Sequence, residues 1–181
     1  MPNSNLRSEG VTSGLSYIWD KGFFGFAWTE FHTNYGSPAE PNVVIDMHQQ
    51  RLDVRGAFYK PFALIKEINY KLATSNYQHT EYEGAEAGTV FKNTGNDVRI
   101  TARHAKIGAW QGVLGLQSEA VRFSANGTEA FAPYSRTVQH AVFAFEELPL
   151  DWGRLSLGAR LESVQVDSEG NPLVARFIPA S

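Results

Sequence analysis

The residues Leu155-Ser-Leu-Gly-Ala-Arg-Leu-Glu162 decide the fold class. Every second residue of this stretch is apolar, so the three leucines and Ala159 share one face, while Ser156, Gly158 and Arg160 lie on the other. A period of two residues is that of a β-strand whose two faces meet different surroundings. The stretch therefore predicts one amphipathic strand.

The same alternation recurs along the chain and predicts seven further strands, although two of these segments follow the pattern less closely. They are Leu15–Trp19, Phe24–Trp28, Leu52–Phe58, Ile68–Leu72, Val98–Ala102, Trp110–Leu116 and Ala141–Phe145, the second and the last being the weaker two. No apolar run approaches the roughly 18 residues that indicate a transmembrane helix. The sequence therefore predicts an all-β, antiparallel, up-and-down arrangement of about eight strands in four hairpins.

The connections indicate which kind of β protein this is. Short turns are expected at 20–22, 61–66, 106–108 and 149–152, and longer connections at 34–42, 81–88 and 126–136, so short and long alternate. Outer-membrane barrels have short periplasmic turns and longer outer loops, so this order favours transmembrane barrel strands. A soluble sandwich and a β-propeller are the alternatives, but a propeller blade needs a turn about every ten residues.

Aromatic residues stand beside the predicted short turns, where amphipathic rings would lie at the membrane interface. The expected members of this girdle are Trp19, Tyr59, Phe62, Trp110 and Trp152. In total, 12 Phe, 7 Tyr and 4 Trp occur in a chain whose mean hydropathy is negative.

Composition excludes several classes of function. The 16 basic and 19 acidic residues are scattered, and the net charge of -3 includes no basic stripe, so nucleic acid is not an expected partner. Without cysteine the chain has no disulfide, thiolate metal site or cysteine nucleophile. No phosphate loop, Gly-x-Ser-x-Gly elbow or zinc-protease motif occurs, so we expect no enzyme. A hydrolase that uses His140 is the alternative left open.

Several motifs, in their order along the chain, resemble the barrel strands of TonB-dependent receptors, most closely the subgroup that includes zinc-uptake receptors. They are Val43–Asp53, Asn76–Glu83, Gly88–Asn93, Trp110–Gln117, Phe123–Pro133, Phe145–Glu147 and Leu157–Glu162. The resemblance covers residues 11–168. It implies a transport protein of the Gram-negative outer membrane, with a 22-stranded barrel and an amino-terminal plug, that imports a scarce ligand such as zinc, another metal chelate or a siderophore.

On this resemblance the chain supplies part of such a barrel. Residues 1–10 are expected to be a polar lead-in, 11–168 a partial barrel, and 169–181 the start of a further strand. The implied partners are outer-membrane lipid, the transported ligand, and the inner-membrane TonB complex acting through a plug that this chain lacks. No resident cofactor is expected. The alternative is a complete eight-stranded barrel that serves as an anchor or adhesion module, in which the strand near Leu15 pairs with that near Leu157.

The candidate ligand-binding residues are His79, Glu81 and Glu83, which alternate along the polar face of the strand that contains Lys71. Imidazole and carboxylate groups on one face suit zinc or a similar metal. The plainer interpretation is a polar lining of the barrel lumen. The other histidines near outer strand ends, His32, His48 and His140, are expected to be solvated.

A second group of polar residues is expected to form a charged ladder on the lumen wall. Its members are Arg51, Asp53, Arg55, Arg99 and Arg103. Cross-strand pairing of opposite charges is the ordinary use of such a ladder, and recognition of an anionic ligand is the more specific one. The Asn126-Gly127 pair is expected at a loop tip.

Overall fold

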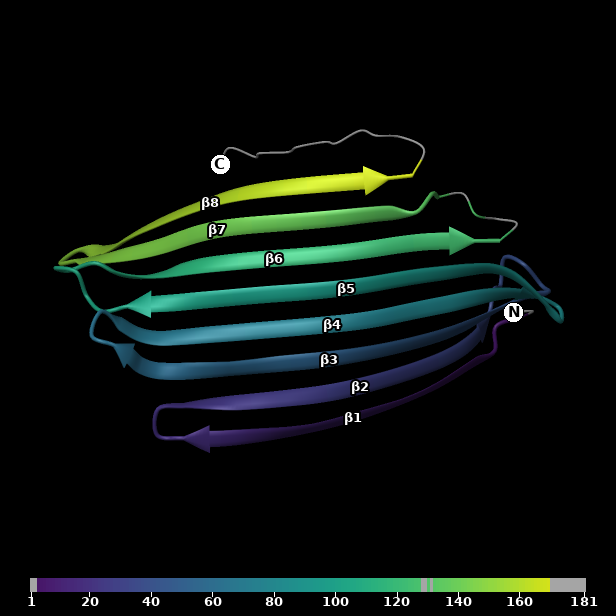
Figure 1. The fold of residues 1–181 in the computed structure, drawn as a ribbon, viewed down its shortest axis with the longest axis horizontal. Coiled ribbons are helices and arrows are strands. Elements are labelled where there is room, and N and C mark those ends of the chain that lie inside the picture. The colour runs from purple at the N-terminus through teal and green to yellow at the C-terminus, as the bar shows by residue number, and fades with distance from the viewer. Residues whose placement is uncertain (1–2, 128–129, 131, 170–181) are drawn as a thin grey trace.

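The computed structural model describes residues 3–127, 130 and 132–169, and these form one antiparallel sheet of eight strands (Figure 1). Each strand pairs only with its neighbours in the sequence, so the order in space is the order in the chain. The strands are β1 (Leu6–Trp19), β2 (Gly22–Gly36), β3 (Val43–Phe62), β4 (Ile65–Glu83), β5 (Glu86–His104), β6 (Gln111–Asn126), β7 (Ser135–Leu150) and β8 (Gly153–Ser168). The predicted all-β, up-and-down fold with eight strands is confirmed.

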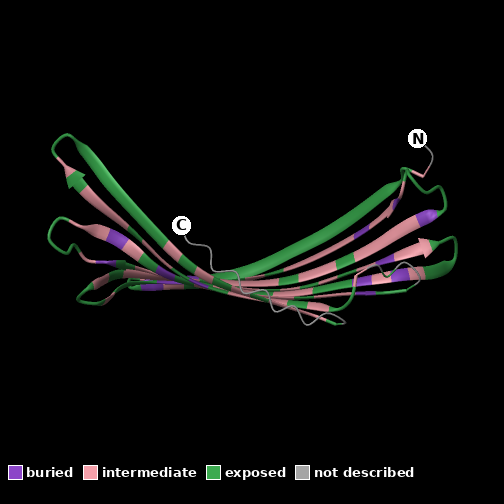
Figure 2. Cartoon of the chain, turned by 90° about the horizontal axis from the view of Figure 1, so that it is seen from above, coloured by how far each residue is buried: buried purple, intermediate pink, exposed green. Residues whose placement is uncertain are grey.

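The sheet is a single bowed layer with two open edges (Figure 2). Strand β1 forms one edge and β8 the other, and the two do not pair with each other. Figure 2 shows both edge strands exposed along most of their length. Among the described residues, no helix is long and apolar enough to span a membrane.

The four predicted short turns lie together at one end of the sheet, and the three remaining connections lie at the other (Figure 1). The middle one of these three differs from the prediction. Residues 81–88 were expected to form a long loop, but β4 continues to Glu83 and β5 begins at Glu86. Gly84 has a φ of 62°, a left-handed conformation that suits glycine and closes a two-residue hairpin. The Glu- and Gly-rich composition of 81–88 predicts a loop, but most of these residues form the ends of β4 and β5.

The ends of the chain also differ from the predicted domain boundaries. Residues 6–10, expected in a polar lead-in, belong to β1 and pair with Phe31–Tyr35 of β2. At the other end, the backbone N–H of Glu169 donates to the carbonyl of Tyr134 at 3.0 Å. The rest of the predicted start of a further strand, 170–181, lies outside the described residues.

The register gives the sheet two distinct faces, because residues paired across strands point to the same side. One row of paired residues runs through Leu161, Val142, Leu116, Ile100 and Tyr70. We call the face that contains this row the apolar face and the opposite face the polar face. Most of the exposed large apolar side chains lie on the apolar face, since the described residues form no second layer that could cover it.

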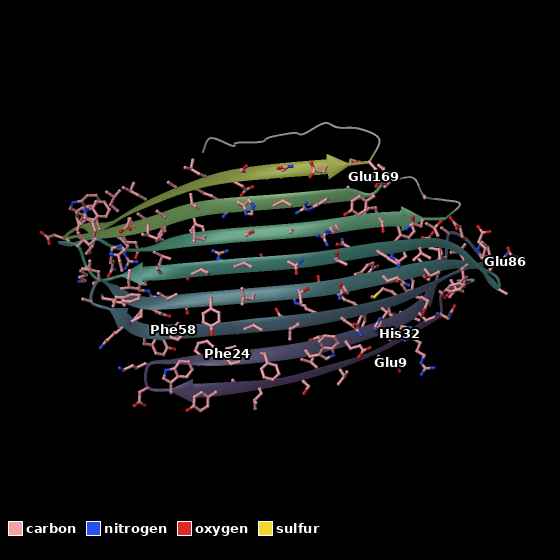
Figure 3. All side chains as sticks on the ribbon, viewed as in Figure 1. Glu9, Phe24, His32, Phe58, Glu86 and Glu169 are labelled. Carbon is pink, nitrogen blue, oxygen red and sulfur yellow. The ribbon has the colours of Figure 1, made fainter. Side chains whose placement is uncertain are left out.

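Aromatic rings cross the apolar face near its short-turn end, where Figure 3 labels Phe24 and Phe58. The ring centroids of Trp19 and Phe58 are 6.1 Å apart, and those of Phe58 and Tyr70 are 5.9 Å apart. Gly56 makes room for this row. A Cβ atom at Gly56 would lie 2.3 Å from the Tyr70 hydroxyl oxygen and 2.5 Å from the Phe23 carbonyl oxygen.

We predict that Gly56→Ala lowers the free energy of unfolding by about 1–3 kcal/mol, because the new methyl group displaces either the Tyr70 ring or the β2 backbone. Urea unfolding of the chain in detergent micelles measures the change. Gly153→Ala is the matched control, since a Cβ atom there meets nothing within 4 Å. Equal stabilities of the two variants would show that the Tyr70 ring does not depend on the space at Gly56.

Candidate functional site

The polar face carries charged residues in rows that follow the register. Arg55, Lys71 and Arg99 are paired across β3, β4 and β5, so three cations form one row. In the next row toward the loop end, Asp97 of β5 pairs with Glu119 of β6. The cationic row thus lies beside an anionic row, so opposite charges are diagonal neighbours on this face and offset the repulsion between like charges within each row.

All five residues of the predicted charged ladder lie on the polar face, but their contacts differ from simple cross-strand pairing. Arg51 donates two hydrogen bonds, of 2.7 and 2.8 Å, to the carboxylate of Asp53 two residues along the same strand. Arg103 does pair across strands, with Glu67 at 3.6 Å. Arg55 forms no ion pair with another described side chain, and Arg99 contacts an aromatic ring.

That ring belongs to Phe143, which lies beneath two guanidinium groups. The Arg99 guanidinium carbon is 4.9 Å from the ring centroid, and the Arg160 guanidinium carbon is 5.9 Å from it. The far end of the ring lies over Gly115, where a Cβ atom would clash with the ring atoms Cζ, Cε1 and Cε2. A cation over an aromatic face is attracted to the ring quadrupole, so Phe143 holds both arginines on the polar face.

At the loop end, the polar face carries an aromatic cluster around His79. The imidazole of His79 stacks on the Phe91 ring, with centroids 4.4 Å apart and planes 16° apart. Tyr77 meets His79 edge-on at 5.5 Å, and Phe123 lies 6.4 Å beyond Phe91. We call Tyr77, His79, Phe91 and Phe123 the aromatic shelf.

The His79 imidazole has one nitrogen without a partner. Its Nδ1 atom is buried and has no hydrogen-bond partner in the described part of the chain. Burial lowers the pKa of His79, which favours the neutral ring. A neutral imidazole nitrogen without a partner is a potential ligand or hydrogen-bonding group for a bound molecule.

His79, Glu81 and Glu83 occupy alternate positions of β4, so they share one face of the sheet, the polar face. Their partners in β3 are, in turn, Met47, Ile45 and Val43. The three predicted metal-binding residues are not gathered into a metal site, however. Among the described residues, no three His, Asp or Glu side chains are arranged to hold a metal ion. The alternation in the sequence gave the shared face correctly, but successive residues on one face are spaced along the strand rather than converging.

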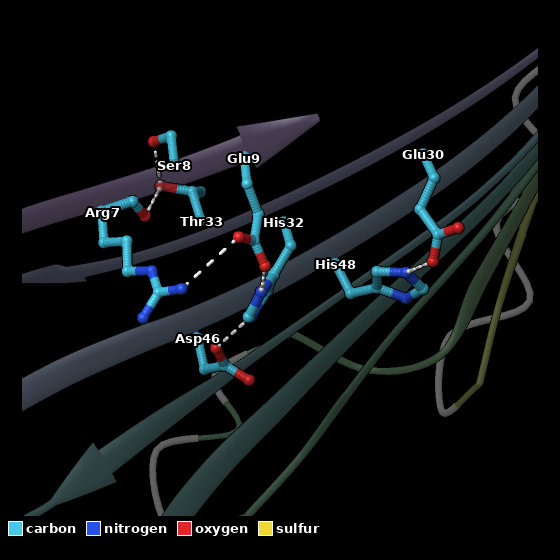
Figure 4. Close-up of polar contacts among 8 residues, drawn as sticks. All are labelled: Arg7, Ser8, Glu9, Glu30, His32, Thr33, Asp46 and His48. Atoms are coloured by element: carbon cyan, nitrogen blue, oxygen red, sulfur yellow. Dashed lines mark hydrogen bonds and ion pairs between the residues drawn. The ribbon is translucent and has the colours of Figure 1, made fainter. Parts of the chain in front are cut away.

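A second polar cluster lies on the apolar face at the loop end of β1, β2 and β3 (Figure 4). His32 Nε2 is 2.7 Å from an Asp46 carboxylate oxygen, and His32 Nδ1 is 3.7 Å from Glu9. Beside it, His48 Nε2 is 2.7 Å from Glu30. We call these five residues the histidine–carboxylate cluster.

Sequence reasoning placed His32 and His48 near outer strand ends but did not find this cluster. The two residues pair directly across β2 and β3, and their ring centroids are 6.4 Å apart. The two histidines are 16 residues apart in the sequence, and only the register of the hairpin shows that they are neighbours in space. The histidines are therefore held by carboxylates rather than simply solvated.

The five aromatic residues expected in an interfacial girdle lie near the short-turn end of the sheet, with Trp110 bridging to Ile107 between β5 and β6. Trp152 and Phe62 are 85% and 68% exposed there, and Trp19 begins the row of rings on the apolar face. Tyr59 instead pairs with Glu67 and so lies on the polar face. Phe58 takes its place, because adjacent residues of a strand point to opposite sides.

No protein-family model matches this chain.

We predict that the His32 imidazole titrates above its ordinary pKa, because the hydrogen bond to Asp46 favours the protonated ring and Glu9 adds to this. Since the pKa is raised in the folded chain, protonated His32 stabilises the fold at low pH. This contribution is lost as the pH rises through the pKa of folded His32. NMR titration of the imidazole measures it.

The Asp46→Asn variant should return the pKa of His32 toward its ordinary value, whereas Asp97→Asn, which removes a carboxylate from the polar face, should leave it unchanged. An Asp46→Asn variant with an unaltered His32 titration would show that the hydrogen bond in Figure 4 does not control this ring.

Proposed function

We propose that this chain forms part of the wall of an outer-membrane β-barrel of the TonB-dependent receptor type, which imports a metal or metal chelate. The main support is the position at which the apolar face changes from apolar to polar residues. On the apolar face, the apolar residue directly before the first polar side chain on the way to the loop end is, from β1 to β8, Leu15, Trp28, Leu52, Leu72, Val98, Leu116, Val142 and Leu161.

From β8 to β2 this boundary shifts in one direction. In β6, β7 and β8 it lies in a single row of paired residues, which continues to Ile100 in β5. In β5 and β4 the boundary lies one row nearer the loop end, and in β3 and β2 two rows. In the edge strand β1, where Ser13 follows Leu15, it lies in the same row as in β4 and β5.

A flat membrane surface cutting across tilted strands would produce this stagger. Two rows correspond to about four residues, or roughly 13 Å at ~3.3 Å per residue. Six strand spacings of ~4.8 Å, from β8 to β2, correspond to about 29 Å, so the boundary is inclined by about 25°. Strands of transmembrane barrels are tilted by roughly 35–45°, so the boundary is inclined somewhat less than such strands.

The strand lengths agree with this proposal. Strands of about 9–11 residues are enough to cross the hydrocarbon when tilted, whereas β3, β4 and β5 have 20, 19 and 19 residues. The additional residues lie beyond the boundary, where the apolar face carries mostly polar residues and the polar face carries the aromatic shelf. The strands would therefore extend past the membrane on the side of the longer connections, as the ligand-binding side of a receptor would require.

The open edges favour a larger barrel over the eight-stranded alternative. A complete eight-stranded barrel needs β1 to pair with β8, and these strands lie at opposite edges of the sheet. Unpaired N–H and C=O groups are not tolerated in hydrocarbon, so both edges require further strands if the sheet lies in a membrane. On this proposal the plug and the TonB complex would act from the polar face.

The aromatic shelf is the part of the polar face best suited to a transported ligand. It lies near the loop end and combines stacked rings with the unpartnered Nδ1 atom of His79. An imidazole nitrogen can bind a metal, and aromatic rings can stack on a flat chelating group. We propose that the ligand contacts the shelf during its passage.

We predict that Ile100→Arg weakens folding of the chain into phosphatidylcholine vesicles by about 2–4 kcal/mol, because it places a charge on the lipid side of the barrel. Thr101→Arg is the matched control, since it places the same charge one residue away on the polar face. Urea titration of folding into the vesicles measures both. Equal losses for the two variants would argue against an apolar face in contact with lipid.

We also predict that His79→Ala weakens binding of zinc, or of an iron-loaded catecholate chelate, by about tenfold, the loss typical of one removed ligand or supporting group. Titration calorimetry of the folded chain measures the affinity. His140→Ala, which removes an exposed histidine from the apolar face, should leave it unchanged. The shelf would be excluded as a ligand contact if both variants bound as the unaltered chain does.

A further inference from the structure

Three cations lie together on the apolar face, beyond the boundary in β5, β6 and β7. Arg122 and Arg136 are paired directly across β6 and β7, and Lys92 pairs with Ser124, the next residue of β6 on the same face. All three are exposed. Paired residues have Cβ atoms roughly 5 Å apart and diagonal neighbours are about 7–8 Å apart, so the three side chains can reach one point.

These cations are not neutralised within the sheet. No ion pair joins any of them to another side chain in the described ranges. Asp167 is paired with Arg136 across β7 and β8, but its carboxylate accepts hydrogen bonds from Gln165 Nε2 at 3.2 and 3.3 Å. Two arginines directly opposite one another repel, so the arrangement favours a bound anion.

An apolar groove lies on the same face and the same strands, nearer the short turns. Its volume is about 610 Å³, and its apolar wall consists of Val98, Ile100, Leu116, Val142 and Leu161. A second groove of about 500 Å³ shares the last four of these residues and continues toward the turns. This second groove exists because Ala102, Ala144 and Ala159 leave open the space that large aromatic rings fill on β1 to β4.

The groove and the cations follow one line along the strands. The outer rim of the groove includes Ser118, His140 and Ser163, which form one row. Arg136 lies four residues beyond His140 on the same face of β7, or roughly 13 Å at ~3.3 Å per residue. The apolar groove therefore runs toward the three cations. This arrangement suits a ligand with an acyl chain and an anionic headgroup.

We propose that this face binds a phosphate-bearing lipid, with its acyl chains in the groove and its phosphate between Arg122, Arg136 and Lys92. The guanidinium fork matches phosphate oxygens in two-point hydrogen bonds. The same level of β1, β2 and β3 carries the carboxylates of the histidine–carboxylate cluster instead, so the lipid site is confined to β5–β8. This inference rests on the proposed orientation of the apolar face toward lipid.

The test compares binding of the full chain to phosphatidylcholine vesicles with binding to vesicles in which about one lipid in five is phosphatidic acid, measured by co-sedimentation. We expect the unaltered chain to prefer the anionic vesicles. Removing two cations by Arg122→Gln with Arg136→Gln should reduce that preference by about tenfold or more. The control, Arg55→Gln with Lys71→Gln, removes an equally paired couple of cations from the polar face and should keep the preference.

Further measurements distinguish failure of the lipid assignment, of the cation site and of the proposed membrane orientation. Free glycerol phosphate, at the phosphate concentration of the vesicles, should not compete, and full competition would overturn the lipid assignment by showing that the headgroup alone suffices. An unchanged preference in the Arg122/Arg136 double variant would overturn the cation site. Failure of the unaltered chain to bind phosphatidylcholine vesicles at all would instead overturn the proposed membrane orientation.

Discussion

The continuous antiparallel register is the constraint on which the rest of this molecule depends. Side chains alternate between the faces of a strand, so a shift of one residue in any pair would move its apolar residues to the other face. The register is broken only near the turn between β3 and β4 and near the tip of β4. Between those places one hydrogen-bonded ladder keeps apolar residues of eight strands on a single side.

A single layer leaves the apolar face without a protein core. The buried apolar residues are few, and Ala57, Ala125 and Ala141 are small, so little of the stabilisation that normally comes from apolar burial arises within the sheet. The backbone ladder, the stacked rings at Gly56 and the arginines over Phe143 are what hold the layer together. Apolar surroundings on one side would supply the missing burial.

Much of the fold follows from local sequence, because a period of two is a local property of the backbone. It predicted eight strands, their order and the shared face of the charged ladder. What it did not predict depends on register or on single dihedral angles. The hairpin at Gly84 needs a left-handed residue. Tyr59 lies on the polar face because Phe58, before it in the regular part of β3, takes the apolar face. The neighbouring positions of His32 and His48, and the staggered boundary, exist only once strands are aligned.

The tight hairpin at Gly84 and Ala85 also limits motion at the loop end. With only two residues between the strands, the tip of β4 and β5 has few backbone conformations available, whereas the connections 37–42 and 127–134 on either side are longer. A molecule that meets the aromatic shelf would thus find rings that are already ordered, and little conformational entropy would be lost there on contact. A molecule of a different shape would have to fit rings whose positions are already set, so this part of the rim acts as a fixed template.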